Sequence, residues 1–101
     1  MAYQQMHIKT FENSYQEDPE AVLLDVRTPQ EVSEGRLDGA IAVDFLASDF
    51  EHQIMKLDPH KSYYVYCRSG KRSEQACLLM DRKGFEKVTN LQGGYLAWLE
   101  K

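Results

Sequence analysis

The sequence lacks several features that would have assigned the chain to a particular class of protein. It has no apolar run near the length that spans a bilayer, so a membrane protein is not expected. Its 12 Lys and Arg against 16 Asp and Glu give a net charge of −4, whereas nucleic-acid binding favours a basic face. Residues 1–18 contain no basic start followed by an apolar stretch, so a secretory signal is not expected and a cytoplasmic location is the default expectation.

Cysteine is also scarce. Cys67 and Cys77 are the only two, which is too few for the disulfide framework of a small secreted domain. They form no CxxC pair and have no histidine at zinc-site spacing, so neither a metal nor another cofactor is expected. The content of 43% hydrophobic and 28% charged residues is that of a folded globular protein, and 101 residues predict one domain over 1–101.

Short apolar runs alternate with helix-like stretches along the chain. The expected strands are residues 6–10, 21–26, 39–44, 62–66 and 87–91, and the expected helices are residues 11–18, 29–34, 48–57, 73–83 and 93–101. Thr28, with Pro29 and Glu31 after it, predicts a capping box at the start of the second helix. Successive strand–helix pairs predict an α/β fold, with a parallel five-stranded sheet and helices on both faces. In such sheets the functional residues lie beyond the carboxyl ends of the strands.

The fourth expected strand ends at Cys67, and a basic loop joins it to the following helix. This loop places Arg68, Lys71 and Arg72 beside one thiol in a chain that is acidic as a whole. The N-terminus of a helix offers free N–H groups and the positive end of a dipole, and Gly70 would allow the loop to turn its own N–H groups inward. These features lower the pKa of a thiol and attract a small anionic substrate.

A purely structural role for Cys67 is the alternative, because a cysteine at a strand end is often a small buried hydrophobe and basic loops are often only solvated. The combination of strand end, cysteine, basic glycine-containing loop and helix favours a reactive thiolate. Cys77 lies among apolar neighbours inside the helix, and we expect it to be a core residue. Asp25 and Arg27 lie at the end of another strand, so they are expected at the same edge of the sheet as Cys67.

Three blocks of the sequence carry a resemblance to a known family. They are LLDVRTPQEVSEGRLDGAI at 23–41, VYCRSGKRS at 65–73 and VTNLQGGYLAW at 88–98. In this order and spacing the chain resembles the single-domain rhodaneses, which are thiosulfate sulfurtransferase-like proteins with a three-layer rhodanese-like fold. The sequence departs from the family pattern at Val32, where an aromatic is common, and at Arg36-Leu37, where His-Ile is common. The second departure bears on the local hydrogen bonding and on the substrate entrance.

The resemblance implies a chemical role for the loop. In the family the cysteine takes a sulfane sulfur from a donor such as thiosulfate and holds it as a persulfide. It then passes the sulfur to a thiophilic acceptor, which is cyanide in assays and a thiol or protein thiol in cells. Carried over, Cys67 is the nucleophile, the loop N–H groups cradle the terminal sulfur, and the three loop cations bind the small anionic donor. The implied substrate-binding residues are Arg68, Ser69, Gly70, Lys71, Arg72 and Ser73.

Asp25, Arg27 and Glu31 are expected to support this loop, and Arg27 can pair with a carboxylate such as Glu31. A direct electrostatic part of Asp25 and Arg27 in the chemistry is the alternative. Two other functions are weighed against sulfur transfer. A phosphatase or arsenate reductase needs a longer loop, because phosphate must fit inside the ring of N–H groups, and the loop from Cys67 to Arg72 is one residue short. A non-catalytic interaction or regulatory module of the same fold usually lacks the cysteine or the loop order, and both are present.

Overall fold

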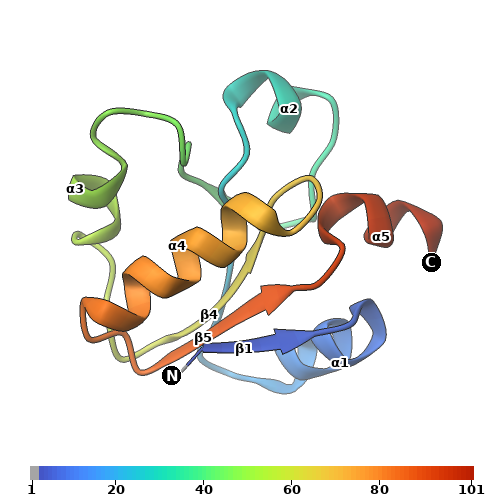
Figure 1. The fold of residues 1–101 in the computed structure, drawn as a ribbon. Coiled ribbons are helices and arrows are strands. Elements are labelled where there is room, and N and C mark those ends of the chain that lie inside the picture. Colours follow the sequence, from blue (N-terminus) through green and yellow to red (C-terminus); the bar gives the residue numbers. More distant parts are fainter. Residues whose placement is uncertain (1–2) are drawn as a thin grey trace.

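A parallel sheet organises the part of the chain that the structure, a computed structural model, describes, which is residues 3–101 (Figure 1). Its strands are β1 (Tyr3–Met6), β2 (Ala21–Asp25), β3 (Ile41–Ala42), β4 (Ser62–Tyr66) and β5 (Lys87–Leu91). The helices are α1 (Ile8–Glu17), α2 (Pro29–Ser33), α3 (Phe50–Ile54), α4 (Lys71–Arg82) and α5 (Gly94–Glu100). The strand order is β1-β5-β4-β2-β3, and every neighbouring pair is parallel. The predicted fold class is confirmed.

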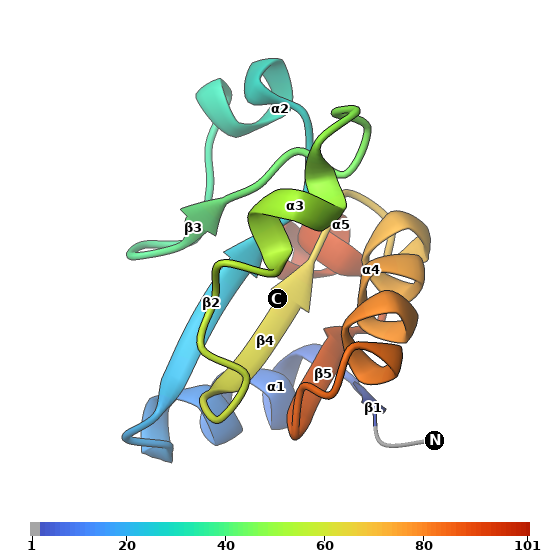
Figure 2. The same ribbon diagram turned by 90° about the vertical axis from the view of Figure 1, so that its left-hand side faces the viewer.

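Two hydrophobic clusters cover the two faces of the sheet. On one face α3 and α4 contribute side chains such as Phe50, Ala76 and Met80, and on the other α1 and α5 contribute Phe11 and Trp98. Figure 2 shows the two pairs of helices on opposite sides of the strands. All of β4 is buried, as expected for a central strand of a sheet covered on both faces.

The register of the two central strands places two sequence motifs side by side. Asp25 of β2 pairs with Tyr66 of β4, and the Val26 N–H donates to the Tyr66 carbonyl at 3.0 Å. Val26 and Cys67, the residues that follow these two strands, therefore lie side by side at the same edge of the sheet. The turn that begins at Val26 and the loop that begins at Cys67 come from blocks far apart in the sequence, and this edge brings them together.

The first strand and helix lie earlier in the chain than predicted. The strand expected at 6–10 is wrong, because β1 pairs Tyr3–Met6 with β5 and the helix already begins at Ile8. His7 is the extended residue before the helix, and its carbonyl accepts the Phe11 N–H at 2.8 Å. Ile8 and Phe11 share the apolar face that packs on the sheet, so packing decides the boundary against the strand-like local sequence.

Several other boundaries differ from the prediction. β3 is only Ile41–Ala42 instead of 39–44, since it is an edge strand and follows a turn at Gly39, whose φ is +82°. α3 is a single turn whose buried residues are Phe50 and Ile54, and α4 begins at Lys71, two residues earlier than predicted. The capping box at Thr28 is confirmed by both of its hydrogen bonds with Glu31.

Candidate active site

The loop after β4 turns sharply into α4 and is held from behind by α5. Gly70 has a φ of +100°, a conformation that glycine adopts without a steric penalty. The carbonyls of Cys67 and Arg68 accept backbone hydrogen bonds from the first turn of α5, at 2.8 and 3.1 Å. A Cβ on Gly94 would lie only 2.6 and 2.5 Å from these two oxygens, so the close approach requires glycine. With the carbonyls turned towards α5, the loop N–H groups are free to face the cysteine side chain.

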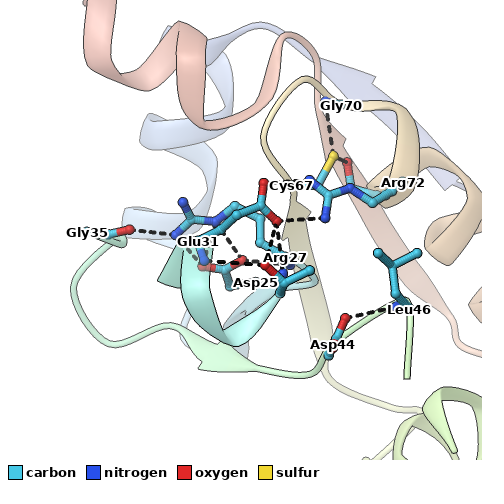
Figure 3. Close-up of polar contacts among 11 residues, drawn as sticks. Asp25, Arg27, Glu31, Gly35, Asp44, Leu46, Cys67, Gly70 and Arg72 are labelled. Carbon is cyan, nitrogen blue, oxygen red and sulfur yellow. Dashed lines mark hydrogen bonds and ion pairs between the residues drawn. The ribbon is translucent and has the colours of Figure 1, made fainter. Parts of the chain in front are cut away.

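The Cys67 sulfur is fully buried and lies among hydrogen-bond donors. The Gly70 N–H donates to Sγ at 3.1 Å, and the Ser73 hydroxyl oxygen lies 3.4 Å from it (Figure 3). Burial by itself would raise the pKa of Cys67. The hydrogen bonds from Ser73, Gly70 and Ser69 outweigh it and hold the pKa of this thiol below its ordinary value. The shift has the direction that the loop sequence predicts, but its larger contributions are hydrogen bonds instead of the cationic side chains.

A buried polar residue of β5, Asn90, completes this environment. Its Oδ1 accepts the Ser73 hydroxyl at 2.5 Å, and its Nδ2 donates to the Gly70 carbonyl at 3.2 Å and to Gln5 Oε1 at 2.9 Å. Asn90 therefore holds both the loop and the first turn of α4. The sequence analysis missed it, although a polar side chain on a strand expected to be buried is a signal that could have found it.

The three loop cations differ in their surroundings. Arg72 is half-buried and donates two hydrogen bonds to Glu31, at 2.8 and 2.9 Å, which joins α4 to α2. This ion pair raises the pKa of Arg72 and lowers that of Glu31 to about 2. Arg68 and Lys71 are exposed at the rim. The structure thus brings all three cations to one loop, but one of them is already bound to a carboxylate.

Asp25 and Arg27 form a buried ion pair beside the loop. Arg27 donates to the Asp25 carboxylate from Nε at 3.0 Å and from Nη2 at 2.8 Å, and to the Gly35 carbonyl at 2.6 Å. Its guanidinium also stacks on the Tyr95 ring, 4.3 Å from the centroid. Arg27 pairs with a carboxylate as expected, but the carboxylate is that of Asp25 and not the suggested Glu31, whose oxygens are held by Arg72 and Thr28. The pair fixes the turn from β2 into α2.

Comparison with known proteins agrees with this arrangement. The pattern of the Rhodanese-like domain matches residues 8–101. The chain belongs to the rhodanese-like family. It is 40% identical over 81 residues to YtwF of Bacillus subtilis, which is named as a sulfurtransferase, covering 80% of this chain and 76% of that protein. It is 37% identical over 82 residues to a sulfurtransferase of Allochromatium vinosum, covering 80% and 75%.

Solved structures show the same fold. A rhodanese-related protein from Thermoplasma volcanium superposes with a TM-score of 0.83 at 26% identity, covering 97% of this chain and 92% of that one. The rhodanese-like fold therefore extends over almost all of the sequence, including β1, which lies outside the residues matched by the family pattern.

The second cysteine of this rhodanese-like chain has a different environment. Cys77 is fully buried inside α4, in the cluster that contains Ala76 and Met80. Burial, with smaller contributions from the charges of Glu74 and Cys67, raises the pKa of the Cys77 thiol. The prediction that Cys77 is a core residue is confirmed.

Both departures from the family pattern contribute a residue to one pocket, whereas Leu37 is buried in the core. Val32 and Arg36 line a pocket of about 470 Å³ with Arg27, Ala42 and Asp44. A second pocket of about 470 Å³ lies beside the loop, and Ser69, Gly70, Lys71 and Asn90 are among its lining residues. The chain thus has one hollow beside the cysteine loop and a separate one lined by the unusual residues Val32 and Arg36.

Residues 3–101 lack two kinds of feature. None of the helices in this range is both long and apolar enough to cross a bilayer. The same residues contain no group of three or more His, Cys, Asp or Glu side chains placed to hold a metal ion.

Proposed function

We propose that this chain is a sulfurtransferase that works through a persulfide on Cys67. It would take a sulfane sulfur from thiosulfate, or from a polysulfide or persulfide, and pass it to a thiophilic acceptor such as cyanide, a thiol or a protein thiol. The observation that carries the proposal is the set of donors around the Cys67 sulfur, from the Ser73 side chain and the N–H groups of Ser69, Gly70 and Ser73. The relatives named as sulfurtransferases support it.

The first half-reaction needs only a thiolate and a place for the arriving sulfur. The Cys67 thiolate attacks the outer sulfur of thiosulfate, an S–S bond forms at Sγ, and the S–S bond of the donor breaks. Sulfite leaves with the electron pair, and the negative charge stays on the terminal sulfur of the persulfide. No general base is required, because the loop hydrogen bonds favour the thiolate. Arg68 and Lys71, exposed at the rim, would attract the dianion.

The second half-reaction returns the enzyme to its starting state. An acceptor thiolate attacks the terminal sulfur, the S–S bond to Cys67 breaks, and the charge returns to Sγ. The product is a persulfide of the acceptor, or thiocyanate when cyanide is used. A reducing compartment such as the cytoplasm would supply acceptor thiols and keep Cys67 free, as it is in the structure.

Intact-mass analysis tests the proposal. The reduced protein is mixed with thiosulfate, and separately with a polysulfide, and its mass is measured without reductant. We expect the addition of one sulfur atom, about 32 Da, located at Cys67 by peptide mapping and removed by a thiol. The matched control is Cys67→Ser, which keeps Cys77 and should gain no mass.

The result also separates sulfur transfer from an interaction module. Transfer to cyanide, followed as thiocyanate release, should accompany the mass change. A protein that folds, is fully reduced and gains no sulfur from either donor would overturn the proposal in favour of the non-catalytic module. A sulfur found on Cys77 instead of Cys67 would overturn the site.

A further inference from the structure

The Ser73 hydroxyl faces two acceptors but has one proton. Its oxygen lies 2.5 Å from Asn90 Oδ1 and 3.4 Å from Cys67 Sγ. A hydroxyl donates one hydrogen bond and accepts others, so it donates to only one of these groups at a time. Asn90 Oδ1 is the nearer acceptor, so we assign the proton to Asn90 when the thiol is neutral, and the oxygen lone pairs are then left for the sulfur. This arrangement suits a neutral thiol, whose S–H donates to Ser73.

Asn90 is held in place for this contact. It is almost fully buried, and its Nδ2 donates to Gln5 Oε1 on β1 and to the Gly70 carbonyl in the loop. These two bonds fix which end of the amide carries the oxygen, since the nitrogen must face the two acceptors. The Oδ1 atom is therefore directed at Ser73.

We propose that Asn90 is a positioning residue that controls the reactivity of Cys67 by competing with the sulfur for the Ser73 proton. When the charge is on Sγ, the hydroxyl turns from Asn90 to the thiolate. When the charge moves to the terminal sulfur of a persulfide, the hydroxyl returns to Asn90. This second step rests on the proposed function, whereas the competition itself does not.

The competition has a definite direction. A hydrogen bond to an ionised acceptor is stronger than one to a neutral amide, so the Ser73 hydroxyl donates to the thiolate once it forms. The resulting stabilisation of the thiolate is reduced by the loss of the hydrogen bond to Asn90. Asn90 thus holds the pKa of Cys67 above the value that the loop would otherwise give. Removing the competing oxygen should make the thiolate easier to form.

Charged groups around the site do not provide the same control. The Asp25–Arg27 pair of the neighbouring β2 and the Glu31–Arg72 pair of α2 and α4 are each internally neutralised. Glu74 of α4 accepts a hydrogen bond from Gln5 at 2.8 Å, so Gln5 lies between it and Asn90, and Cys77 of α4 is buried. The loop cations Arg68 and Lys71 are exposed. A substitution of Asn90 by a neutral residue leaves all these charges unchanged.

The test is a titration of Cys67 in a double-mutant cycle. Asn90→Leu removes the competing amide oxygen, Ser73→Ala removes the hydroxyl group that donates the hydrogen bond, and the third variant carries both changes. The pKa of Cys67 is measured from the ultraviolet absorbance of the thiolate, as the difference between each protein and the same protein with Cys67→Ser. This readout needs neither substrate nor turnover, so it can fail independently of the sulfurtransferase proposal.

We expect Asn90→Leu to lower the pKa by about 0.5 to 1 unit when Ser73 is present, as the loss of one competing hydrogen bond predicts. In the Ser73→Ala background the same change should have little effect. Thr89→Val is the matched control, because Thr89 is the neighbouring buried residue of β5 and its hydroxyl has no partner within residues 3–101. It should leave the pKa unchanged.

Two results would overturn the proposal. An unchanged or raised pKa in Asn90→Leu would mean that Asn90 only braces the loop through the Gly70 carbonyl. An equal shift with and without Ser73 would mean that Asn90 does not act through the hydroxyl. Circular dichroism and the melting temperature check that each variant is folded, and Asn90→Ala replaces Asn90→Leu in the cycle if the leucine variant does not fold.

Discussion

The two cysteines of this chain are both fully buried, yet their thiols have opposite properties. Cys67 ends a strand and meets the Gly70 N–H and the Ser73 hydroxyl, whereas Cys77 lies inside a helix among apolar side chains. The pKa of the first is held below its ordinary value, and that of the second is raised. Burial disfavours the thiolate at both positions, so the hydrogen-bond donors around Cys67 account for the opposite directions of the two pKa shifts.

The largest effect should come from exchanging the two thiols for inert groups. Cys67→Ser should abolish sulfur transfer and leave the fold intact, because the nucleophile is lost but the hydroxyl fits the same space. Cys77→Ala should keep most of the activity and lower the free energy of unfolding by about 1 kcal/mol, through the small cavity it leaves. Thiocyanate release and chemical denaturation measure the two quantities. The opposite pattern would exchange the roles of the cysteines.

Alkylation should then distinguish the two thiols in the unmodified protein. Because the pKa of Cys67 is lowered, its rate of reaction with iodoacetamide should rise with pH around a midpoint below the ordinary thiol pKa of about 8.5. Cys77 should react only after the protein is unfolded in guanidinium, because its thiol pKa is raised and it lies among apolar side chains with no hydrogen-bond donor to its sulfur within residues 3–101. Peptide mass spectrometry over a pH series gives both rates. Equal rates in the native protein would contradict the comparison.

Gly94→Ala should displace the backbone of the cysteine loop, because the new Cβ would meet the Cys67 and Arg68 carbonyl groups. Its Cβ would lie 2.6 Å from the Cys67 carbonyl oxygen at a φ of +61°, so we expect a loss of about 3 kcal/mol in stability and a loss of activity. Gly84→Ala is the matched control, with a φ of +91° and open space around the new Cβ. It should lower stability by about 1–2 kcal/mol and leave transfer unchanged. Equal effects of the two variants on transfer would show that the contact with α5 does not matter for the loop.

The rim charges should have the smallest effects. Arg68→Ala and Lys71→Ala should leave the melting temperature nearly unchanged, and at least one of them should lower kcat/KM for thiosulfate by about tenfold, while Arg72→Ala should lower it less because Arg72 is already paired with Glu31. Glu31→Gln should raise kcat/KM, because it weakens the hold on Arg72 and glutamine still completes the capping box. Added salt should weaken the wild type in the same direction as the alanine variants. Wild-type kcat/KM in all three alanine variants at low salt would show that the cations are only a solvated rim.

The sequence was informative where a residue type alone implies a geometry. The strand before Cys67, the loop with Gly70 and the capping box at Thr28 follow from local patterns, and the structure contains them. Which groups lower the pKa of the thiol was less predictable. The sequence predicts that loop N–H groups, the helix N-terminus and the nearby cations all lower it, and the backbone donors are present, but the weight of each group and the part of the Ser73 hydroxyl depend on distances that only the fold defines.

The errors concern choices between partners that the sequence leaves open. Arg27 had two carboxylates within reach along the chain, and the buried Asp25 was closer than Glu31. Asn90 was counted as part of a buried strand, because nothing in the sequence shows that β5 brings it to Ser73. Gly94 lies in the third sequence block, but the space it leaves for the carbonyls of Cys67 and Arg68 appears only when α5 is placed against the loop.

The position of β1 has a practical consequence for the choice of domain boundaries. The family pattern begins at residue 8, so a chain shortened to that match would keep the cysteine, the loop and every motif. It would nevertheless lose Gln5, which holds the Asn90 amide, and the strand that pairs with β5. Such a fragment would retain the complete signature of a sulfurtransferase while its thiol titrated differently, so assays of trimmed domains could mistake a boundary effect for a property of the family.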